Sequence, residues 1–316
     1  MTLAKIASVS ALQLRYIQET VHALVCGDIL SYSAADETFT LEDATRDCLV
    51  DQESKTFMLG YLEMAQVAYS ALPAITKAIQ DGGGVSYSDF GPKVLDIINR
   101  ATSPDFKHKL QSWITLIPDI HRKMTLGPCK VLDLGCGQGI STLVLAKAYP
   151  KTTFLGLDLS STSIDKATQN SILYGSPPNV KFLCKSIEGW VSDLKKEAAE
   201  NSLFDVIFTF DVIHDLPAPL EALAQIHSLL AGPGHYFMLE PGCGSSLSEN
   251  LGPRGAFLYS LSLFHCMTQS LAVGGEGLGA AWGPKSAESY CRRAGFSQFR
   301  KLDLSGGTDN IYIVQK

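Results

Sequence analysis

Charged side chains are scarce in this chain. They make up 18% of its 316 residues, against about 25% in an average globular domain. Acidic groups outnumber basic ones, and the formal charge is −6. An acidic chain has no global attraction for nucleic acids or anionic membranes. We therefore expect neither as a partner, and we expect a core built from the 46% of residues that are hydrophobic.

Cysteine motifs are also missing, although the chain has eight cysteines. None of them forms a C-x-x-C pair, and no group of cysteine and histidine has the spacing of zinc ligands. Several lie in apolar runs, where a thiol behaves as a small hydrophobic group. The pattern excludes a disulfide scaffold and predicts reduced thiols in a cytoplasmic protein without a metal.

Signal-peptide and membrane-span patterns are absent as well. Residues 1–5 lack the charged start and long apolar region of a secretory signal. The most apolar stretch, 256–273, contains His265 and Gln269. It therefore predicts a buried helix rather than a membrane span.

The first 127 residues have a mainly helical pattern. Apolar residues recur at helical spacing over 11–26, and two short β-rich segments flank a polar turn within 29–41. A helix followed by such a two-stranded wing is typical of a winged-helix element. Longer helical patterns follow over 55–80 and 106–116.

From residue 129 strands and helices alternate, which is typical of a mostly parallel sheet covered on both faces. The last two strands flank a Gly306-Gly307 turn, so they predict an antiparallel hairpin. The expected strands are Lys130–Leu134, Thr153–Asp158, Val180–Cys184, Asp205–Phe210, Tyr236–Glu240, Phe299–Leu304 and Asn310–Val314, and the expected helices start after Gly139, at Ser160, around Trp190–Ala199 and over Pro219–Leu230.

A glycine-rich turn after the first of these strands is the strongest chemical signal. It reads Gly135-Cys136-Gly137-Gln138-Gly139, and Asp158 ends the next strand 19 positions later. Glycines let a backbone approach a ligand, and an acid at this distance is expected to bind a ribose diol. The third glycine comes one residue earlier than in the dinucleotide fingerprint. Asp133 precedes the turn, which suits a ligand with an ammonium group.

Together these features resemble the class I S-adenosylmethionine (SAM)-dependent methyltransferases. That family has an acid two residues before a G-x-G-x-G turn, an acid at the end of the second strand, and a C-terminal hairpin. The resemblance covers 129–316. It implies a Rossmann-like α/β fold with a seven-stranded sheet, and SAM as the cofactor.

The resemblance also assigns residues to parts of SAM. It implies that Asp133 acts near the ammonium group, that Asp158 binds the ribose hydroxyls and that Leu159 packs on the adenine. Ser186 stands where many members carry an acid that contacts the adenine amino group. The residues expected to bind the cofactor are Asp133, Gly135, Cys136, Gly137, Gly139, Asp158, Leu159, Ser186, Ile187, Phe210 and Asp211.

More narrowly, the chain resembles bacterial and animal small-molecule methyltransferases that carry an N-terminal winged-helix domain, as plant-type O-methyltransferases do. The implied organisation is a partial winged-helix domain over 1–53 that lacks the family's first helices, a helical region covering the substrate over 54–127, and a SAM-binding domain over 128–316. The last contains an insertion at 242–283. The resemblance further implies a homodimer formed through the N-terminal region.

Catalytic candidates follow the fourth strand, beyond whose carboxyl end ligands of open α/β sheets bind. The sequence there reads Phe210-Asp211-Val212-Ile213-His214-Asp215. Plant-type O-methyltransferases have a His-Asp pair at this place, so the resemblance implies that His214 is a general base oriented by Asp215. Imidazole suits that task near neutral pH. The alternative, a packing or gating role for His214, stays open.

Residues expected to line the acceptor site come from several regions of the chain. They are Tyr69, Tyr87, Glu240, His265 and Trp282, and ordinary packing is the competing interpretation for each. Five glycines between 274 and 283 fit either the hinge of a lid or a tight loop.

The favoured function is methyl transfer from SAM to a small molecule, at a hydroxyl or an amine, by in-line displacement. A protein methyltransferase is one alternative, although the N/D-P-P-Y/F motif of many amino-group methylators is missing after the fourth strand. A non-catalytic SAM-binding or winged-helix regulator is another. It is disfavoured because 11–26 contains one arginine and no lysine for phosphate contacts. A nicotinamide dehydrogenase does not fit the glycine spacing.

Overall fold

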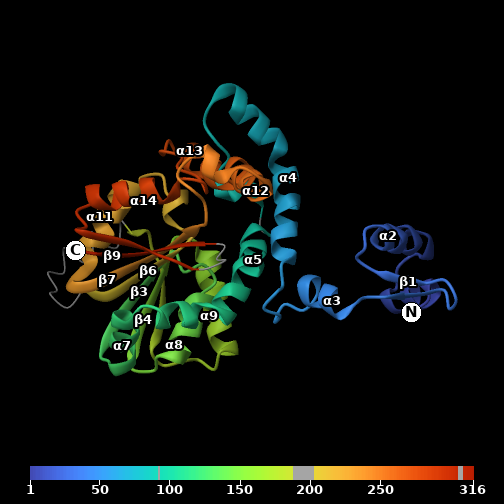
Figure 1. Ribbon diagram of the computed structural model, residues 1–316, viewed down its shortest axis with the longest axis horizontal. Helices are drawn as coiled ribbons and strands as arrows, with labels where there is room; N and C mark the ends of the chain where they lie inside the picture. Colours follow the sequence, from blue (N-terminus) through green and yellow to red (C-terminus); the bar gives the residue numbers. More distant parts are fainter. Residues whose placement is uncertain (92, 188–202, 305–308) are drawn as a thin grey trace.

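The computed structural model describes residues 1–91, 93–187, 203–304 and 309–316. The helix expected around Trp190–Ala199 and the Gly306-Gly307 turn lie outside these residues. A large α/β body contains the sheet, and a small N-terminal unit stands beside it at the end of the α3 segment (Figure 1).

A twisted sheet of seven described strands lies at the centre of the α/β body, in the order β5-β4-β3-β6-β7-β9-β8. The strands from β5 to β7 are parallel, and β9 runs antiparallel to both of its neighbours. This is the α/β architecture with a C-terminal hairpin that the sequence predicts. The strands are β3 Cys129–Leu134, β4 Thr152–Asp158, β5 Val180–Cys184, β6 Phe204–Phe210, β7 Leu230–Pro241, β8 Gln298–Leu302 and β9 Asp309–Gln315.

Helices cover both faces of the sheet, because its strands are apolar on both sides. One core layer packs α6, α7 and α8 against β3, β6 and β7, and the other packs α11 and α14 against the opposite face (Figure 1). The helices of this domain are α6 Leu110–Thr115, α7 Pro118–Leu126, α8 Ile140–Ala148, α9 Ser161–Leu173, α11 Pro219–Leu229 and α14 Gly283–Arg293.

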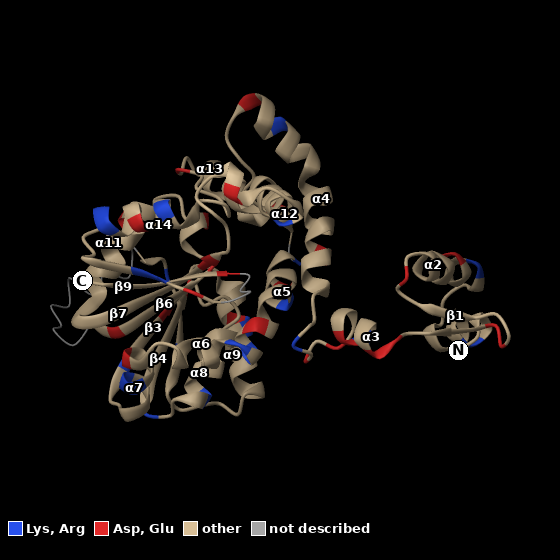
Figure 2. Cartoon of the chain, viewed as in Figure 1, with Lys and Arg blue, Asp and Glu red and all other residues tan. Residues whose placement is uncertain are grey.

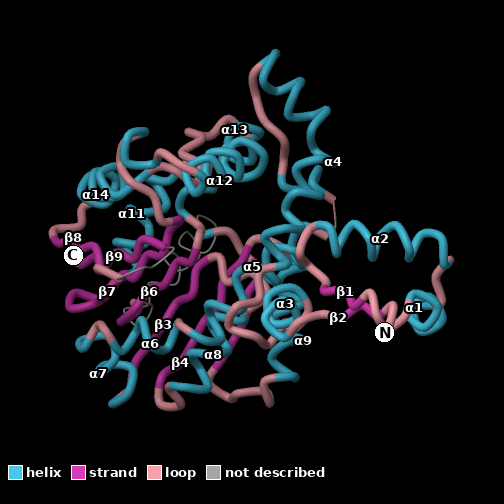
Figure 3. Tube along the Cα trace, turned by 45° about the vertical axis from the view of Figure 1, so that its right-hand side comes forward, coloured by secondary structure: helices cyan, strands magenta, loops and turns pink. Residues whose placement is uncertain are grey.

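The N-terminal unit has its own small core of Ile17, Val21 and Phe39. The hairpin predicted within 29–41 is present as β1 and β2, and the helix predicted over 11–26 begins at Leu14. A further helix, α1, precedes it and was not predicted. The tube in Figure 3 shows these elements as a unit of helices and one hairpin. Its elements are α1 Leu3–Ser10, α2 Leu14–Cys26, β1 Ser31–Ser33 and β2 Thr38–Thr40.

The helical region and the insertion after β7 pack against each other beside the sheet (Figure 1). The amide of Val85 donates to Thr268 Oγ1 at 2.8 Å, which joins the two segments. A Cβ at Gly84 would lie 1.9 Å from Thr268 O, so this approach requires a glycine. The elements are α3 Asp43–Leu49, α4 Leu59–Asp81, η1 Tyr87–Phe90 and α5 Val94–His108, then η4 Leu247–Asn250, α12 Pro253–Leu261, the π-helical turn η5 Ser262–Cys266 and α13 Met267–Ala272.

The buried helix predicted over 256–273 is therefore α12, η5 and α13 in sequence. Among the described residues, none of the helices combines the length and the apolar character that a membrane crossing requires.

Candidate active site

The glycine-rich turn joins β3 to α8 at the carboxyl edge of the sheet. Gly135, Gly137 and Gly139 have φ values of 73°, 51° and 77°, a range that other residues rarely adopt. A Cβ at Gly139 would lie 2.7 Å from Phe182 Cζ, whereas a Cβ at Gly137 would meet no atom within 4 Å. Gly139 is thus required for packing, and Gly137 leaves open space beside the turn. Cys136, which lies between Gly135 and Gly137, is buried.

Asp158, at the end of β4, holds the same turn in place. Its Oδ2 accepts from the amide of Gly137 at 2.9 Å, and its Oδ1 accepts from Ser160 at 2.8 Å. Burial raises the pKa of Asp158, and the two amides oppose that rise. Each carboxylate oxygen has further lone pairs for a hydroxyl donor. The next side chain, Leu159, is 74% exposed.

Asp133 lies in β3 and is 1% exposed. Its Oδ2 accepts from Ser141 Oγ at 2.7 Å and from Thr142 Oγ1 at 2.6 Å, which fixes the first turn of α8. Its Oδ1 is buried and has no hydrogen-bond partner among the described residues. Burial raises the pKa of Asp133 to about 6. An unsatisfied buried acceptor beside the turn needs a donor from a ligand or water.

Three other expected cofactor residues lie near this edge in different surroundings. Ser186 is half-buried after β5, and Ile187 is buried in a core layer. The Phe210 ring packs between Phe208 and Phe106, with centroid distances of 5.6 and 5.2 Å. Core packing therefore accounts for Phe210 without a cofactor.

Asp211 follows β6 with a φ of 54°, which is uncommon for a non-glycine residue. Its amide donates to Leu239 O at 2.9 Å. Its Oδ1 is buried without a hydrogen-bond partner in the described part of the chain, and burial raises its pKa well above the ordinary value. Backbone strain and an unsatisfied acceptor coincide here, as is common at ligand sites.

Tyr61 of α4, which is 41% exposed, interacts electrostatically with Asp211, and sequence reasoning missed it. Burial raises the pKa of Tyr61, and the charge of Asp211 raises it further. Tyr69, which the sequence placed at the site, is 77% exposed. The buried face of α4 contains Val67 and Ala71, and a residue midway between them in a helix points the opposite way. The structure does not bring Tyr69 together with the other candidates.

His214 lies in the short turn η3 Ile213–Asp215 and is 2% exposed. Its Nδ1 is 2.6 Å from Glu240 Oε2. Glu240 is the next-to-last residue of β7 and also accepts from the amide of Ile213 at 3.0 Å and from Trp282 Nε1 at 3.1 Å. The contact that orients the Nδ1 side of His214 thus comes from Glu240, which the sequence assigned to the acceptor.

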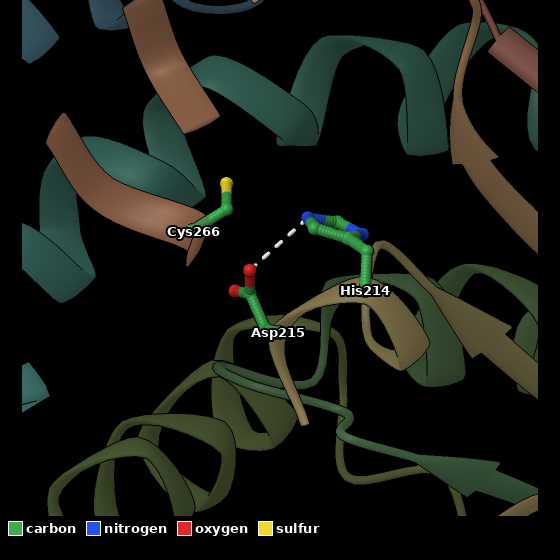
Figure 4. Close-up of side chains that lie close together, drawn as sticks. All are labelled: His214, Asp215 and Cys266. Carbon is green, nitrogen blue, oxygen red and sulfur yellow. Dashed lines mark ion pairs between the residues drawn. The ribbon is translucent and has the colours of Figure 1, made fainter. Parts of the chain in front are cut away.

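Asp215 lies on the other side of the imidazole. Its Oδ1 is 3.1 Å from His214 Nε2, an ion-pair contact outside hydrogen-bond geometry (Figure 4). Burial alone lowers the pKa of His214, but Asp215 and Glu240 together raise it well above 6.5. Burial favours the neutral form of Asp215, yet the charge of His214 lowers its pKa overall.

Residues of the insertion lie beside His214 and Asp215. His265 in η5 is 5% exposed, and the rings of Tyr87 and Phe90 lie 5.8 and 5.1 Å from it. Burial lowers the pKa of His265. The sulfur of Cys266, the next residue, lies within 4.8 Å of ligand atoms of His214 and Asp215 (Figure 4).

The five-glycine segment is a tight loop bound to the turn of His214. The amide of Gly279 donates to His214 O at 3.2 Å, and that of Glu276 donates to Pro217 O at 3.0 Å. A Cβ at Gly275 would lie 2.4 Å from Pro217 Cα. These contacts favour the tight-loop interpretation over a hinge, since each would have to break before the segment moved.

Comparisons with known proteins give sequence matches to part of the chain and structural matches to its full length. Residues 127–259 match the sequence model of the family described as Methyltransferase domain. The malonyl-[acyl-carrier protein] O-methyltransferase of Halalkalibacterium halodurans is 31% identical over 121 residues, which cover 38% of this chain and 42% of that protein. The chain thus spans less than half the length of this curated relative.

Solved structures that resemble the whole chain include two methyltransferases. An O-methyltransferase family protein from Burkholderia thailandensis has a TM-score of 0.71 at 16% identity, covering 100% of this chain and 88% of that one. Human N-acetylserotonin methyltransferase in complex with SAM has a TM-score of 0.65 at 16% identity, covering 100% and 87%. At these identities the likeness shows a common fold.

Proposed function

We propose that the protein is a SAM-dependent methyltransferase that acts on a hydroxyl of a small molecule. This rests on the methyltransferase-domain match over 127–259 and on the hairpin of β8 and β9 that completes the class I fold. One juxtaposition supports this most strongly. The glycine turn follows β3 and Asp158 is the last residue of β4, while His214 follows β6 and its buried partner Glu240 lies near the end of the adjacent strand β7. A cofactor site and a proton acceptor therefore share one edge of the sheet.

The residues around the turn fit SAM. Gly137 leaves space for a ligand, and Asp158 has free lone pairs for the ribose hydroxyls. The unsatisfied Oδ1 of Asp133 suits a donor from the ammonium end, directly or through water. Leu159 offers an exposed apolar surface to the adenine. SAM, when bound, supplies a methyl group on a sulfonium leaving group.

His214 removes the acceptor proton as the new bond forms. Bound SAM would supply the methyl group and the sulfonium leaving group, and Nε2 of His214 would accept the proton of the acceptor hydroxyl. Glu240 at Nδ1 fixes the tautomer and stabilises the imidazolium that results. Trp282 holds Glu240 in turn. General-base catalysis of this kind contributes about 10²- to 10⁴-fold.

The acceptor is a largely apolar molecule with an aromatic ring. Tyr87, Phe90 and His265 form one wall, where rings pack edge to face. Tyr61 and Phe257 form another, with ring centroids 6.3 Å apart. The two phenol hydroxyls, from Tyr61 and Tyr87, supply polar contacts that orient the molecule.

The organisation over 1–53, 54–127 and 128–316 supports a homodimer formed through the N-terminal region. The N-terminal unit stands away from the α/β body (Figure 1) and exposes apolar side chains, with Leu12 60% and Tyr16 77% exposed. In a homodimer, the same apolar surface of the second copy would cover these side chains. All cysteines are free thiols, which supports a reducing, cytoplasmic location.

Alternative functions have less support. Arg15 is the one lysine or arginine of the helix that would meet DNA, and it forms an ion pair with Glu19. Lys and Arg in the α/β body lie mainly on outer helices (Figure 2). Neither feature favours nucleic acid as a partner. A protein substrate would need a peptide to reach His214, which is 2% exposed.

Calorimetric titration and a labelled-methyl assay test the proposal. The native chain is expected to bind SAM and not NAD. His214→Gln is expected to keep SAM affinity within about twofold and to lower turnover about 100-fold, as loss of a general base does. The matched control is His108→Gln on the exposed end of α5. Stabilisation by NAD instead of SAM would sink the proposed function, and unchanged turnover in His214→Gln would sink the base assignment alone.

A further inference from the structure

Three metal-ligand types meet at the active-site turn. The ligand atoms of His214, Asp215 and Cys266 all lie within 4.8 Å of one another, and Figure 4 shows their side chains converging. Cys266 comes from η5 of the insertion, about 50 positions after the other two. The sequence predicts no metal because this group is formed by tertiary packing and not by motif spacing.

The imidazole of His214 has the orientation of a metal ligand. Its Nδ1 is engaged by Glu240 at 2.6 Å, which leaves Nε2 as the atom on the side of Asp215. A carboxylate on the far nitrogen of a histidine is the usual outer partner of a metal-bound histidine, because it fixes the tautomer and raises the basicity of the ligand. Glu240 is itself held by Ile213 and Trp282.

The buried polar atoms around this cluster include one without a hydrogen bond. Oδ1 of Asp215 is buried and pairs with Nε2 of His214 at 3.1 Å. Nδ1 of His265 has no hydrogen bond within the described ranges, and that side chain is 5% exposed. His265 adjoins Cys266 and interacts electrostatically with both Asp215 and His214. Buried polar atoms without partners are rare and need an explanation such as an ion.

We propose that this cluster binds one thiophilic divalent cation of the zinc type, held by Nε2 of His214, the carboxylate of Asp215 and Sγ of Cys266, and that the cation inhibits methyl transfer. Imidazole, carboxylate and thiolate are the ligands that Zn²⁺ prefers, whereas Mg²⁺ and Ca²⁺ prefer oxygen alone. The sulfur–metal bond forms as the thiol proton leaves to water.

Inhibition follows because the cation occupies the lone pair of Nε2, which then cannot accept the acceptor's proton. This consequence rests on the proposed function. The binding site does not, because its ligands are present whatever reaction the protein performs.

Cobalt titration of the full chain tests the site without any activity. Co²⁺ in a thiolate-containing tetrahedral site gives a sulfur-to-metal charge-transfer band. We expect one equivalent of this band in the native chain and its loss in Cys266→Ala, with Zn²⁺ affinity at least tenfold weaker. Cys291→Ala, an equally buried cysteine in α14, is the control and should keep both. Absence of the band in the native chain, or its survival in Cys266→Ala, would overturn the site.

The inhibitory role is tested by the ratio of methyl-transfer rates with Zn²⁺ and with a chelator. In the native chain we expect the rate with Zn²⁺ to be at least tenfold lower than the rate with the chelator. In Cys266→Ala we expect the two rates to be nearly equal. Cobalt binding with an unchanged rate ratio would overturn the inhibition. A chain that binds cobalt but transfers no methyl group would instead count against the proposed function, and would overturn the inhibition that rests on it.

Discussion

Nδ1 of His214 lies 2.6 Å from Oε2 of Glu240, and the two side chains are 3% and 1% exposed. A buried charge pair is stabilising only when its remaining polar atoms have partners. Here Glu240 also accepts from Ile213 and Trp282, and the backbone oxygen of His214 accepts from Gly279. Residues from the turn η3, from β7 and from the 279–282 segment thus fix the position of one imidazole.

Glu240→Gln should move the pH dependence of turnover. The carboxylates of Asp215 and Glu240 outweigh burial and raise the pKa of His214 well above 6.5. A base works when neutral, so native turnover should rise with pH above 6.5. Removing the charge of Glu240 lowers that pKa, and the rise should shift to lower pH while the maximal rate falls about 100-fold. The pH profile of kcat measures both effects.

The control for this change is Glu221→Gln on the exposed start of α11. It should leave the profile in place. If Glu240→Gln lowers the maximal kcat without moving the pH profile, Glu240 has a structural role alone. A purely structural change would leave the pKa of His214 unaltered.

Asp158→Asn should weaken SAM binding rather than the chemical step. The amide places a donor where Oδ2 now accepts from Gly137 or where Oδ1 accepts from Ser160, and it loses charge-assisted bonds to the ribose hydroxyls. We expect a dissociation constant at least tenfold higher by calorimetry, with turnover at saturating SAM less affected. Asp165→Asn, exposed on α9, is the matched control. Equal affinities in the two variants would refute the ribose assignment.

Two glycine variants should separate folding from cofactor binding. A Cβ at Gly156 would lie 2.5 Å from Phe182 Cδ1, so Gly156→Ala should cost about 1 to 3 kcal/mol of unfolding free energy through overpacking. Gly137→Ala meets no atom within 4 Å. It should cost about 1 to 2 kcal/mol through its positive φ and lower SAM affinity more than tenfold. Urea unfolding and calorimetry measure the two quantities. Normal SAM affinity in Gly137→Ala would mean that the cofactor does not approach this turn.

Much of the fold could be predicted because the signals are local. Val180–Cys184 is the predicted strand to the residue, since an apolar run bounded by polar turns determines it. Helix α5 was missed because Pro104 and the nearby Gly91 resemble loop composition. Helix α14 was missed because its mostly polar sequence follows a glycine-rich segment. Tertiary packing stabilises both helices where their composition does not.

The candidate site also has a part that the sequence predicts and a part that it does not. The glycine turn and Asp158 lie within one β-turn-α-β unit, so spacing alone relates them. His214 and Glu240 were each identified, but their pairing depends on β6 and β7 being neighbours. Tyr61 was missed and Tyr69 misplaced because the pattern of α4 does not tell which face meets the domain.

Asp133 should make the unfolding free energy of the chain decrease as the pH rises. Its ordinary pKa is 3.8, and burial raises it to about 6 in the folded chain. The folded state therefore binds the proton more tightly than the unfolded state. This stabilisation is fully present below pH 3.8 and is lost as the pH rises through about 6. A shift of about two units corresponds to a loss on the order of 3 kcal/mol.

Asp133→Asn removes this titration and keeps one amide oxygen as acceptor for Ser141 and Thr142. Between pH 4 and 7, the unfolding free energy of the native chain should fall relative to that of the variant, as measured in urea. Asp165→Asn should run parallel to the native chain because its side chain is exposed. SAM should reduce the native decline, since an ammonium group near Asp133 favours its ionised form. A constant gap between native and Asp133→Asn across this range would contradict the burial argument, and a decline that SAM leaves unchanged would place the ammonium elsewhere.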